Sequence, residues 1–307
     1  MNGWTSFAKA SRLNVIPVML IPVALGALGA YVWTGEFHPW LFLLTLAGAA
    51  AAHLFSNMIN DLWDFKNGAD GEADHHVDAI STNSGFLTQG IWSLRKFEAV
   101  TWLLFVIAAA SGVILGLLSG WWALVLGALG GLIAYFYVAP PVQFGYRGKG
   151  YSEIAILLSF GILPVMGAYY VQTSHMDYRA LLLSLPIGLL TTLILFNHHF
   201  LHWQADRQAG KNTLVVVWGE KRALRFSRLL LLLACLSMVA CVSAGALPLY
   251  GLAALITVLP LYMVYGRLQE HNRSEAYLPL MGASMKATMS SGGVLILSLL
   301  IQSLLQT

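Results

Sequence analysis

Closely spaced carboxylates and amides end an apolar run near residue 60. Asn57, Asn60, Asp61 and Asp64 lie three or four residues apart. If the helix continues through them, Asn57, Asp61 and Asp64 share one face. Ionised side chains at a bilayer edge are costly and usually functional, and neighbouring carboxylates repel unless a cation lies between them. Oxygen donors without cysteine favour Mg²⁺ over Zn²⁺, so the spacing predicts a magnesium site for a phosphorylated substrate.

A second polar cluster ends another apolar run near residue 206. His198, His202 and Asp206 recur every four residues, which places them on one helical face. We expect Asp206 to face Asp61 and Asp64 across a cavity and to complete a two-metal site for a diphosphate.

Two basic residues follow Asp206 in the chain. Arg207 and Lys211 would add positive charge beside the leaving group, and Gly210 between them predicts the end of the helix. For His199 we expect an interhelical hydrogen bond.

A third polar segment joins two later apolar runs. Its residues are Tyr137, Pro140, Pro141, Tyr146, Arg147, Gly148, Gly150 and Glu153. An arginine beside aromatic rings can grip a phosphate and line an apolar entrance. An ordinary turn with interfacial tyrosines explains the same composition, and both readings stay open.

The elements that must position these residues are membrane helices. The 307 residues are 58% hydrophobic and 10% charged, with mean hydropathy +0.69, which excludes a soluble globule. The net charge of +3 does not suggest nucleic-acid binding. No run alternates polar and apolar residues, so we expect one all-α transmembrane domain over 1–307. Nine apolar runs predict nine helices: 14–34, 40–60, 99–118, 121–138, 154–172, 181–201, 229–246, 249–266 and 286–305.

Charge separates the two ends of this nine-span arrangement. Of the 17 Lys and Arg residues, 16 fall on the side of the N-terminus, and Arg179 is the exception. Basic loops favour the cytoplasm, so we expect a cytoplasmic N-terminus and an external C-terminus. Of the 14 acidic residues, 12 lie on the same side, with Glu36 and Asp177 opposite. Acid and base gathered on one face predict a cytoplasmic-side active-site cavity.

These motifs together resemble the UbiA-type superfamily of intramembrane aromatic prenyltransferases, over nearly the whole chain. Within it, the sequence is most similar to the 1,4-dihydroxy-2-naphthoate polyprenyltransferases of menaquinone biosynthesis. The resemblance is carried by the segments 57–70, 146–148, 161–173 and 206–215. The family's nine-helix architecture agrees with the count reached from hydropathy and charge.

The resemblance implies transfer of a polyprenyl chain from an allylic diphosphate to an aromatic quinone precursor, assisted by Mg²⁺. It implies catalytic roles for Asp61, Asp64 and Asp206. The residues expected at the metal are Asn57, Asp61, Asp64, His202 and Asp206. The residues expected at the substrates are Asn60, Lys66, Asp70, Tyr137, Tyr146, Arg147, His198, Arg207 and Lys211. The expected location is a bacterial inner membrane, with membrane lipid around the helices and with neither nucleic acid nor an obligate protein partner.

The second motif departs from the family pattern. His202 stands where the family has an aspartate, Leu201 precedes it where an arginine is frequent, and His198 and His199 replace asparagines. A neutral imidazole ligates metals but lacks the charge of a carboxylate. The number of metal ions and the identity of the acceptor therefore stay open.

Two other functions compete with prenyl transfer. The histidines of 198–202 and the pair His75 and His76 resemble the histidine boxes of membrane di-iron oxidoreductases, since imidazole suits iron. Only His198 and His202 have the HxxxH spacing, however. A transporter would place its polar site at mid-membrane and show an inverted repeat, whereas these carboxylates lie at span ends.

Overall fold

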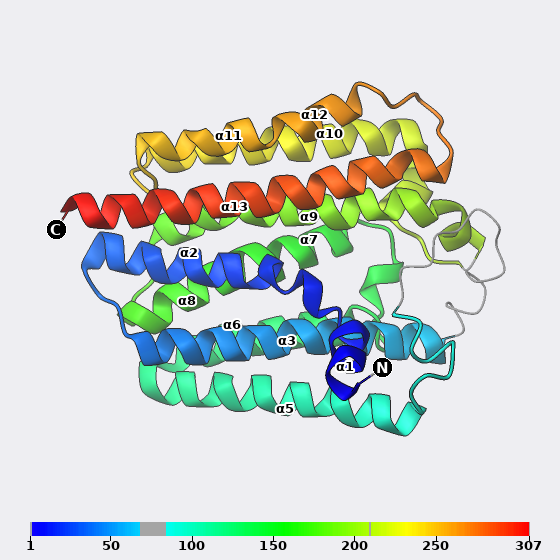
Figure 1. Cartoon of the computed structure of the whole chain (residues 1–307), viewed down its shortest axis with the longest axis horizontal. Coiled ribbons are helices and arrows are strands. Elements are labelled where there is room, and N and C mark those ends of the chain that lie inside the picture. Colours follow the sequence, from blue (N-terminus) through cyan, green and yellow to red (C-terminus); the bar gives the residue numbers. More distant parts are fainter. Residues whose placement is uncertain (1, 68–83, 209, 307) are drawn as a thin grey trace.

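The computed structural model describes residues 2–67, 84–208 and 210–306 and shows a bundle of long, roughly parallel helices (Figure 1). Its long helices are α2 (Pro17–Thr34), α3 (Pro39–Lys66), α5 (Leu94–Ser119), α9 (Tyr178–Gln208), α10 (Leu214–Ser243) and α13 (Leu278–Gln306), and α6 (Trp121–Phe136) is shorter, with 16 residues. The shorter ones are α1 (Gly3–Ala10), η1 (Leu13–Val15), η2 (Phe144–Tyr146), α7 (Tyr151–Leu157), η3 (Leu158–Ile162), α8 (Leu163–Thr173), η4 (Leu249–Ala253), α11 (Ala254–Thr257), α12 (Leu259–Tyr265) and η5 (Ser274–Tyr277). These described residues form no β-strand, which confirms the all-α prediction.

The described helices match the predicted apolar runs in number of segments but not all in length. Seven segments are long and apolar enough to cross a membrane, so the chain is an integral membrane protein. The predicted spans 121–138 and 249–266 correspond to the shorter apolar helices Trp121–Phe136 and Leu249–Tyr265. The count of nine crossings therefore stays a prediction.

The helices that carry the polar clusters are longer than their apolar runs. Helix α3 continues to Lys66, and α9 to Gln208, beyond the predicted ends at 60 and 201. At 1.5 Å per residue these helices are about 42 Å and about 46 Å long, against about 30 Å for the hydrocarbon core of a bilayer. The extra turns are rigid supports for Asp61, Asp64 and Asp206.

Helix α10 begins 15 residues before the predicted start at 229, at Leu214. The side chain of Thr213 caps it by accepting a hydrogen bond from the backbone N–H of Val216. Its first turn is apolar, but the backbone breaks at Gly219 and charged side chains follow between Glu220 and Arg228, which lowers the hydropathy there. One of them, Glu220, is buried and accepts a hydrogen bond from the Tyr277 hydroxyl at 2.6 Å. This bond connects α10 to η5.

Helix α9 forms the centre of the bundle. It packs against α10, α13, α7 and η3, and its buried apolar side chains run through the main core, Leu183, Ile187 and Phe196 among them. Where α9 meets η3, a π-helical turn, Gly161 lies against Gly188. A Cβ on Gly161 would come within 2.6 Å of the Gly188 Cα, so only glycine permits this close approach.

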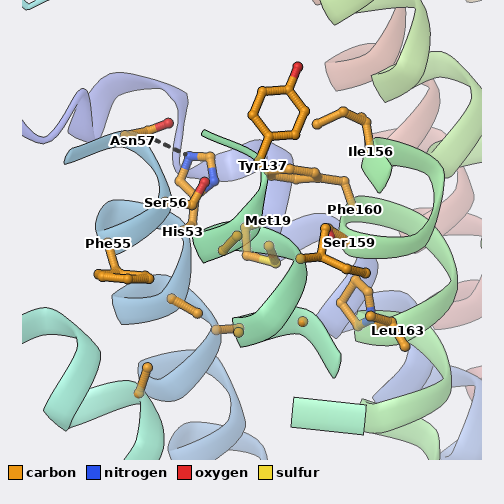
Figure 2. A pocket seen from close by; sticks show the side chains of 18 of the residues that line it. Met19, His53, Phe55, Ser56, Asn57, Tyr137, Ile156, Ser159, Phe160 and Leu163 are labelled. Carbon is orange, nitrogen blue, oxygen red and sulfur yellow. Dashed lines mark hydrogen bonds between the residues drawn. The ribbon is translucent and has the colours of Figure 1, made fainter. Parts of the chain in front are cut away.

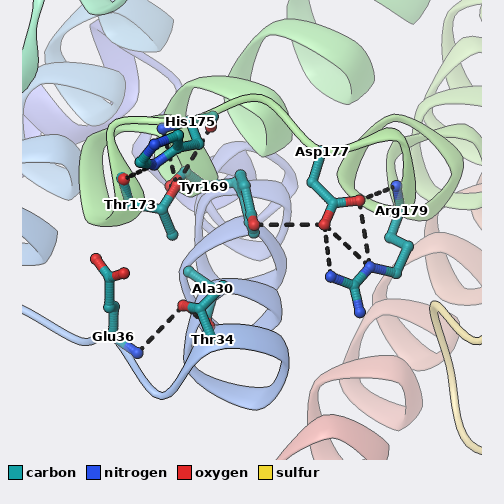
Figure 3. A network of polar contacts seen from close by, with 8 residues as sticks. All are labelled: Ala30, Thr34, Glu36, Tyr169, Thr173, His175, Asp177 and Arg179. Carbon is teal, nitrogen blue, oxygen red and sulfur yellow. Dashed lines mark hydrogen bonds and ion pairs between the residues drawn. The ribbon is translucent and has the colours of Figure 1, made fainter.

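A polar network closes the end of the bundle near the α8–α9 connection (Figure 3). Asp177 accepts hydrogen bonds from Arg179, the shortest at 2.6 Å, and the Tyr169 hydroxyl lies 3.5 Å from the same carboxylate. The Arg179 guanidinium also lies 4.8 Å from the Trp33 ring of α2. Hydrogen bonds from Arg179 lower the pKa of Asp177. The network therefore joins α9 to α2 and α8.

Replacing this carboxylate will weaken the bundle in a pH-dependent way. Because the folded-state pKa lies below the unfolded value of about 3.9, the ionised Asp177 stabilises the fold above that pH, and the contribution is lost as pH falls through the folded value. Asp177→Asn is expected to lower the free energy of unfolding by about 0.5–1 kcal/mol at neutral pH. In detergent, its melting temperature should also fall less steeply than that of the unaltered protein as the pH is lowered. Glu36→Gln, an exposed carboxylate at the same end, is the control. Equal melting of both variants at neutral pH would contradict this role.

Candidate functional site

A cavity of about 1350 Å³ is lined by residues of both acidic clusters. Asn57, Asn60, Asp61 and Asp64 of α3 line it, and so do His198, His202 and Asp206 of α9 and Lys211 just beyond that helix. Tyr137, which follows α6, lies on the same wall. Residues predicted to meet across a cavity thus do border one cavity.

The carboxylate of Asp61 is buried and held on both oxygens. A guanidinium nitrogen of Arg12 donates to Oδ1, and the backbone N–H of Ser84 donates to Oδ2 at 2.9 Å. Arg12 has a left-handed backbone, with φ of 55°, at the joint between α1 and η1. This turn brings the basic side chain into the cavity, so a cation from the N-terminal segment balances the charge of Asp61.

Asp64 accepts a hydrogen bond from the Tyr146 hydroxyl of η2. Burial, with the negative charge of Asp64, raises the pKa of Tyr146 well above its usual value. Burial also raises the pKa of Tyr137 to about 12. Both phenols therefore stay protonated near neutral pH and serve as hydrogen-bond donors beside the acidic cluster.

The cavity face of α9 holds Asp206 one turn beyond His202. The rings of His198 and His202 lie 4.8 Å apart between centroids. Nε2 of His202 and Oδ1 of Asn60 are buried without a hydrogen-bond partner within the described part of the chain. Buried polar atoms of this kind are rare in folded proteins, and here both border the cavity, where a bound ligand would satisfy them.

The donor set fits Mg²⁺ in kind. Carboxylates and amide oxygens are its preferred ligands. Across the residues described, no three His, Cys, Asp or Glu side chains are close enough to hold a metal by themselves. Mg²⁺ usually takes one or two carboxylates and fills the rest of its shell with water and substrate phosphates. An ion bound beside Asp61, Asp64 and Asp206 would therefore need water and substrate phosphates in its shell as well.

Several residues predicted at the substrates lie away from the cavity. Lys66 pairs with Glu98 of α5 at 2.6 Å. Arg147 and Arg207 are exposed and are not among the lining residues. Asp70, like His75 and His76, is outside the residues that the structure describes. The roles expected for them stay predictions.

Two lining residues were missed by reasoning from the sequence. Arg12 appeared only as a basic residue before the first span. His53 precedes Asn57 by one helical turn, and its Nε2 lies 3.4 Å from the Asn57 amide nitrogen. That i, i+4 spacing was a usable signal for His53, whereas nothing local in the sequence announces the left-handed turn at Arg12.

The rest of the cavity is largely apolar. Figure 2 shows Met19, Phe160 and Leu163 around the space beside His53 and Tyr137. Small residues of α5 and α6 widen it, since a Cβ added to Gly112, Gly127 or Gly131 would meet nothing within 4 Å. These two helices also expose large apolar side chains that do not line the cavity, Leu117 of α5 and Leu129 of α6 among them. The wall between cavity and surroundings is thus one helix thick.

Comparison with known proteins gives a consistent result. A sequence profile of the UbiA prenyltransferase family matches residues 19–299. The chain is 30% identical to the 2-carboxy-1,4-naphthoquinone phytyltransferase of Synechocystis sp. over 66% of this chain and 63% of that protein. It is also 30% identical to the 1,4-dihydroxy-2-naphthoate octaprenyltransferase of Escherichia coli, over 76% of this chain and 75% of that enzyme. The match therefore spans less than two thirds of the cyanobacterial relative.

Solved structures share the fold at low sequence identity. The apo structure of a UbiA homolog from Aeropyrum pernix K1 aligns with TM-score 0.68 and 18% identity over 92% of this chain and 97% of that one. A UbiA homolog from Archaeoglobus fulgidus, solved with DMAPP and Mg²⁺, aligns with TM-score 0.66 and 17% identity over 94% and 98%. The bundle is thus of the same kind as these proteins.

The acidic end of the cavity predicts metal-dependent binding of inorganic diphosphate. Asp206→Asn is expected to weaken binding of Mn²⁺ with diphosphate about 10-fold or more, because it removes negative charge from the cavity wall. Electron paramagnetic resonance of the purified protein measures the bound Mn²⁺. Asp177→Asn at the opposite end is the control. Unaltered binding in Asp206→Asn would place the metal elsewhere.

Proposed function

The chain belongs to the UbiA prenyltransferase family, and from this membership we propose that it transfers a polyprenyl chain from an allylic diphosphate to 1,4-dihydroxy-2-naphthoate or a related quinone precursor. The observation that carries the proposal is the cavity itself, whose acidic end suits a metal diphosphate and whose large apolar remainder suits an isoprenoid tail. The names of the two relatives at 30% identity support a naphthoate-type acceptor.

The chain's own residues bind and orient the donor. Asp61, Asp64 and Asp206 would bind the metal ion that accompanies the diphosphate. Oδ1 of Asn60 and Nε2 of His202 would then gain the partner that they lack. Mg²⁺, when bound there, would neutralise the departing diphosphate.

Further groups stabilise the leaving group directly. Arg12 and Lys211 add positive charge at the same end of the cavity, and the protonated Tyr137 donates a hydrogen bond. Loss of diphosphate leaves positive charge on the allylic carbon.

The apolar part of the cavity protects that carbon. Aromatic faces attract cations, and Phe55, Phe105 and Phe160 line the space. Side chains that exclude water keep it from trapping the cation before the aromatic ring attacks. The tail lies among α3, α5 and α6, where the small residues leave room.

We further propose the orientation that the charges favour, with the N-terminus in the cytoplasm, the C-terminus outside, and the cavity opening toward the cytoplasm of a bacterium. Family membership favours prenyl transfer over the di-iron and transporter functions that the histidines and polar residues left open.

Removing one aspartate tests the reaction. Membranes supplied with Mg²⁺, a labelled prenyl diphosphate and candidate aromatic acids should yield a prenylated lipid that mass spectrometry identifies. Asp64→Ala is expected to lower the transfer rate about 100-fold or more, because the metal ion that binds the diphosphate loses a ligand. Membrane insertion should be unchanged. Excess EDTA should do the same to the unaltered protein. Full activity in either case would refute the metal's role.

The histidine at position 202 makes a separate prediction. If its imidazole ligates the metal, His202→Asp keeps transfer and shifts metal preference toward Mg²⁺ over softer ions, because carboxylate oxygen is the harder ligand. His202→Ala is expected to lower the rate about 10-fold. Rates measured with Mg²⁺, Mn²⁺ and Zn²⁺ compare the three proteins. Unchanged kinetics in His202→Ala would remove this residue from the site.

A further inference from the structure

A carboxylate and an imidazole that the proposed chemistry does not use are buried together beside the cavity. Glu153, on the first turn of α7, is 6% exposed, and His199, on α9, is 5% exposed. Nδ1 of His199 lies 3.9 Å from Oε1 of Glu153. Within the described residues, neither oxygen of Glu153 nor Nδ1 of His199 has a hydrogen-bond partner.

Such a pair is costly as a purely structural feature. A buried polar group without a hydrogen bond costs of the order of 1–3 kcal/mol, and more when it is charged. A carboxylate in this position is stabilised when a cation stands beside it. An imidazole becomes that cation when it takes up a proton. The pair is therefore suited to receive a proton.

The two side chains are ordered from the cavity inward. His199 lines the cavity together with Ala155 and Ile156 of α7, whereas Glu153 is not among the lining residues. The imidazole can meet a molecule in the cavity, and the carboxylate lies behind it. A base that contacts the substrate and a carboxylate that orients the base form a recurrent arrangement in enzymes.

The position along α9 fits the acceptor rather than the diphosphate. His199 precedes Asp206 by seven residues, which is about 10 Å along a helix. It is thus about two helical turns deeper in the bundle than Asp206, on the side of the cavity away from the acidic end.

Other ionisable groups near the pair have different tasks. Tyr137 faces Glu153 and remains a hydrogen-bond donor, because burial raises its pKa to about 12. Lys211 and His202 lie toward the diphosphate side of His199, and His198 is the residue before it on α9, with the two rings 6.4 Å apart between centroids. Among the residues described, His199 is the one of these three histidines that has a carboxylate within 4.0 Å.

We propose that His199 accepts the hydroxyl proton of the aromatic acceptor and that Glu153 positions and balances the imidazolium. This step rests on the proposed function. As the O–H bond breaks, its electron pair moves into the ring, and a ring carbon bonds to the first carbon of the prenyl chain. The allylic C–O bond breaks, and its pair leaves with the diphosphate. When the attacked carbon loses CO₂, the C–C bonding pair restores the aromatic ring, and the ring oxygen regains the proton from His199. His199 is then a catalytic residue and Glu153 a positioning residue.

The test uses His199→Asn, Glu153→Gln, Glu153→Asp and the double variant His199→Asn with Glu153→Gln, in the full chain, on acceptors whose hydroxyl groups span a range of acidity. His199→Asn and Glu153→Gln are each expected to lower kcat roughly 100-fold. Their KM for the prenyl diphosphate should stay within about 2-fold of the value for the unaltered protein. The double variant should be no slower than His199→Asn, because the two residues act as one unit. Glu153→Asp should recover part of the rate.

Acceptor acidity separates this role from a structural one. A hydroxyl that is already ionised needs no base, so the loss should shrink as acceptor acidity rises. The quantity to compare is the slope of log kcat against acceptor acidity within each variant. A smaller folded fraction lowers kcat equally for every acceptor, so it does not change this slope. Glu220→Gln, which removes a buried carboxylate outside the cavity, should leave the slope unchanged. Equal losses on all acceptors, or losses that multiply in the double variant, would overturn the dyad. Absence of any prenylated product from the unaltered protein would refute the proposed function instead.

Discussion

The rest of this structure depends on carboxylates placed at the edge of an apolar cavity, away from bulk water. Asp61, Asp64 and Asp206 border one space whose remaining walls are largely apolar, so their charges are poorly screened. The fold answers with donors aimed at them, including the Arg12 guanidinium and the Tyr146 hydroxyl. The same negative field that these donors offset is what draws a divalent cation and its diphosphate.

Holding that field in place requires stiff supports. Helices α3 and α9 extend past the hydrophobic thickness, so their polar ends belong to the same rigid rods that are anchored in the core. The loops that cross this end are tied down by contacts to the rods. The backbone N–H of Asn212 donates to the Tyr146 carbonyl at 3.1 Å, which joins the α9–α10 connection to η2. The helices that pack the bundle therefore also fix the positions of the site residues.

The sequence was sufficient for the helices and for the meeting of the acidic clusters, because hydropathy and i, i+4 spacing report burial and helical faces directly. It was insufficient where a long-range contact decides. Lys66 follows the aspartates in sequence but turns to Glu98, and Arg12 enters the cavity from a left-handed turn. The start of α10 was missed because charged side chains early in this helix lower the hydropathy there. For the segment that holds Glu153, a phosphate grip and an ordinary turn both stayed open, and neither predicted its burial beside His199.

The one-helix-thick wall of α5 and α6 has a thermodynamic consequence for the tail. In a bilayer, acyl chains of lipids lie against the outer side of this wall and are as apolar as the side chains that line its inner side. Moving an isoprenoid from the bilayer interior into the cavity exchanges one hydrocarbon surrounding for another, with little net hydrophobic gain. Selection among lipids must therefore come from the polar head, and the tail contributes mainly by whether it fits.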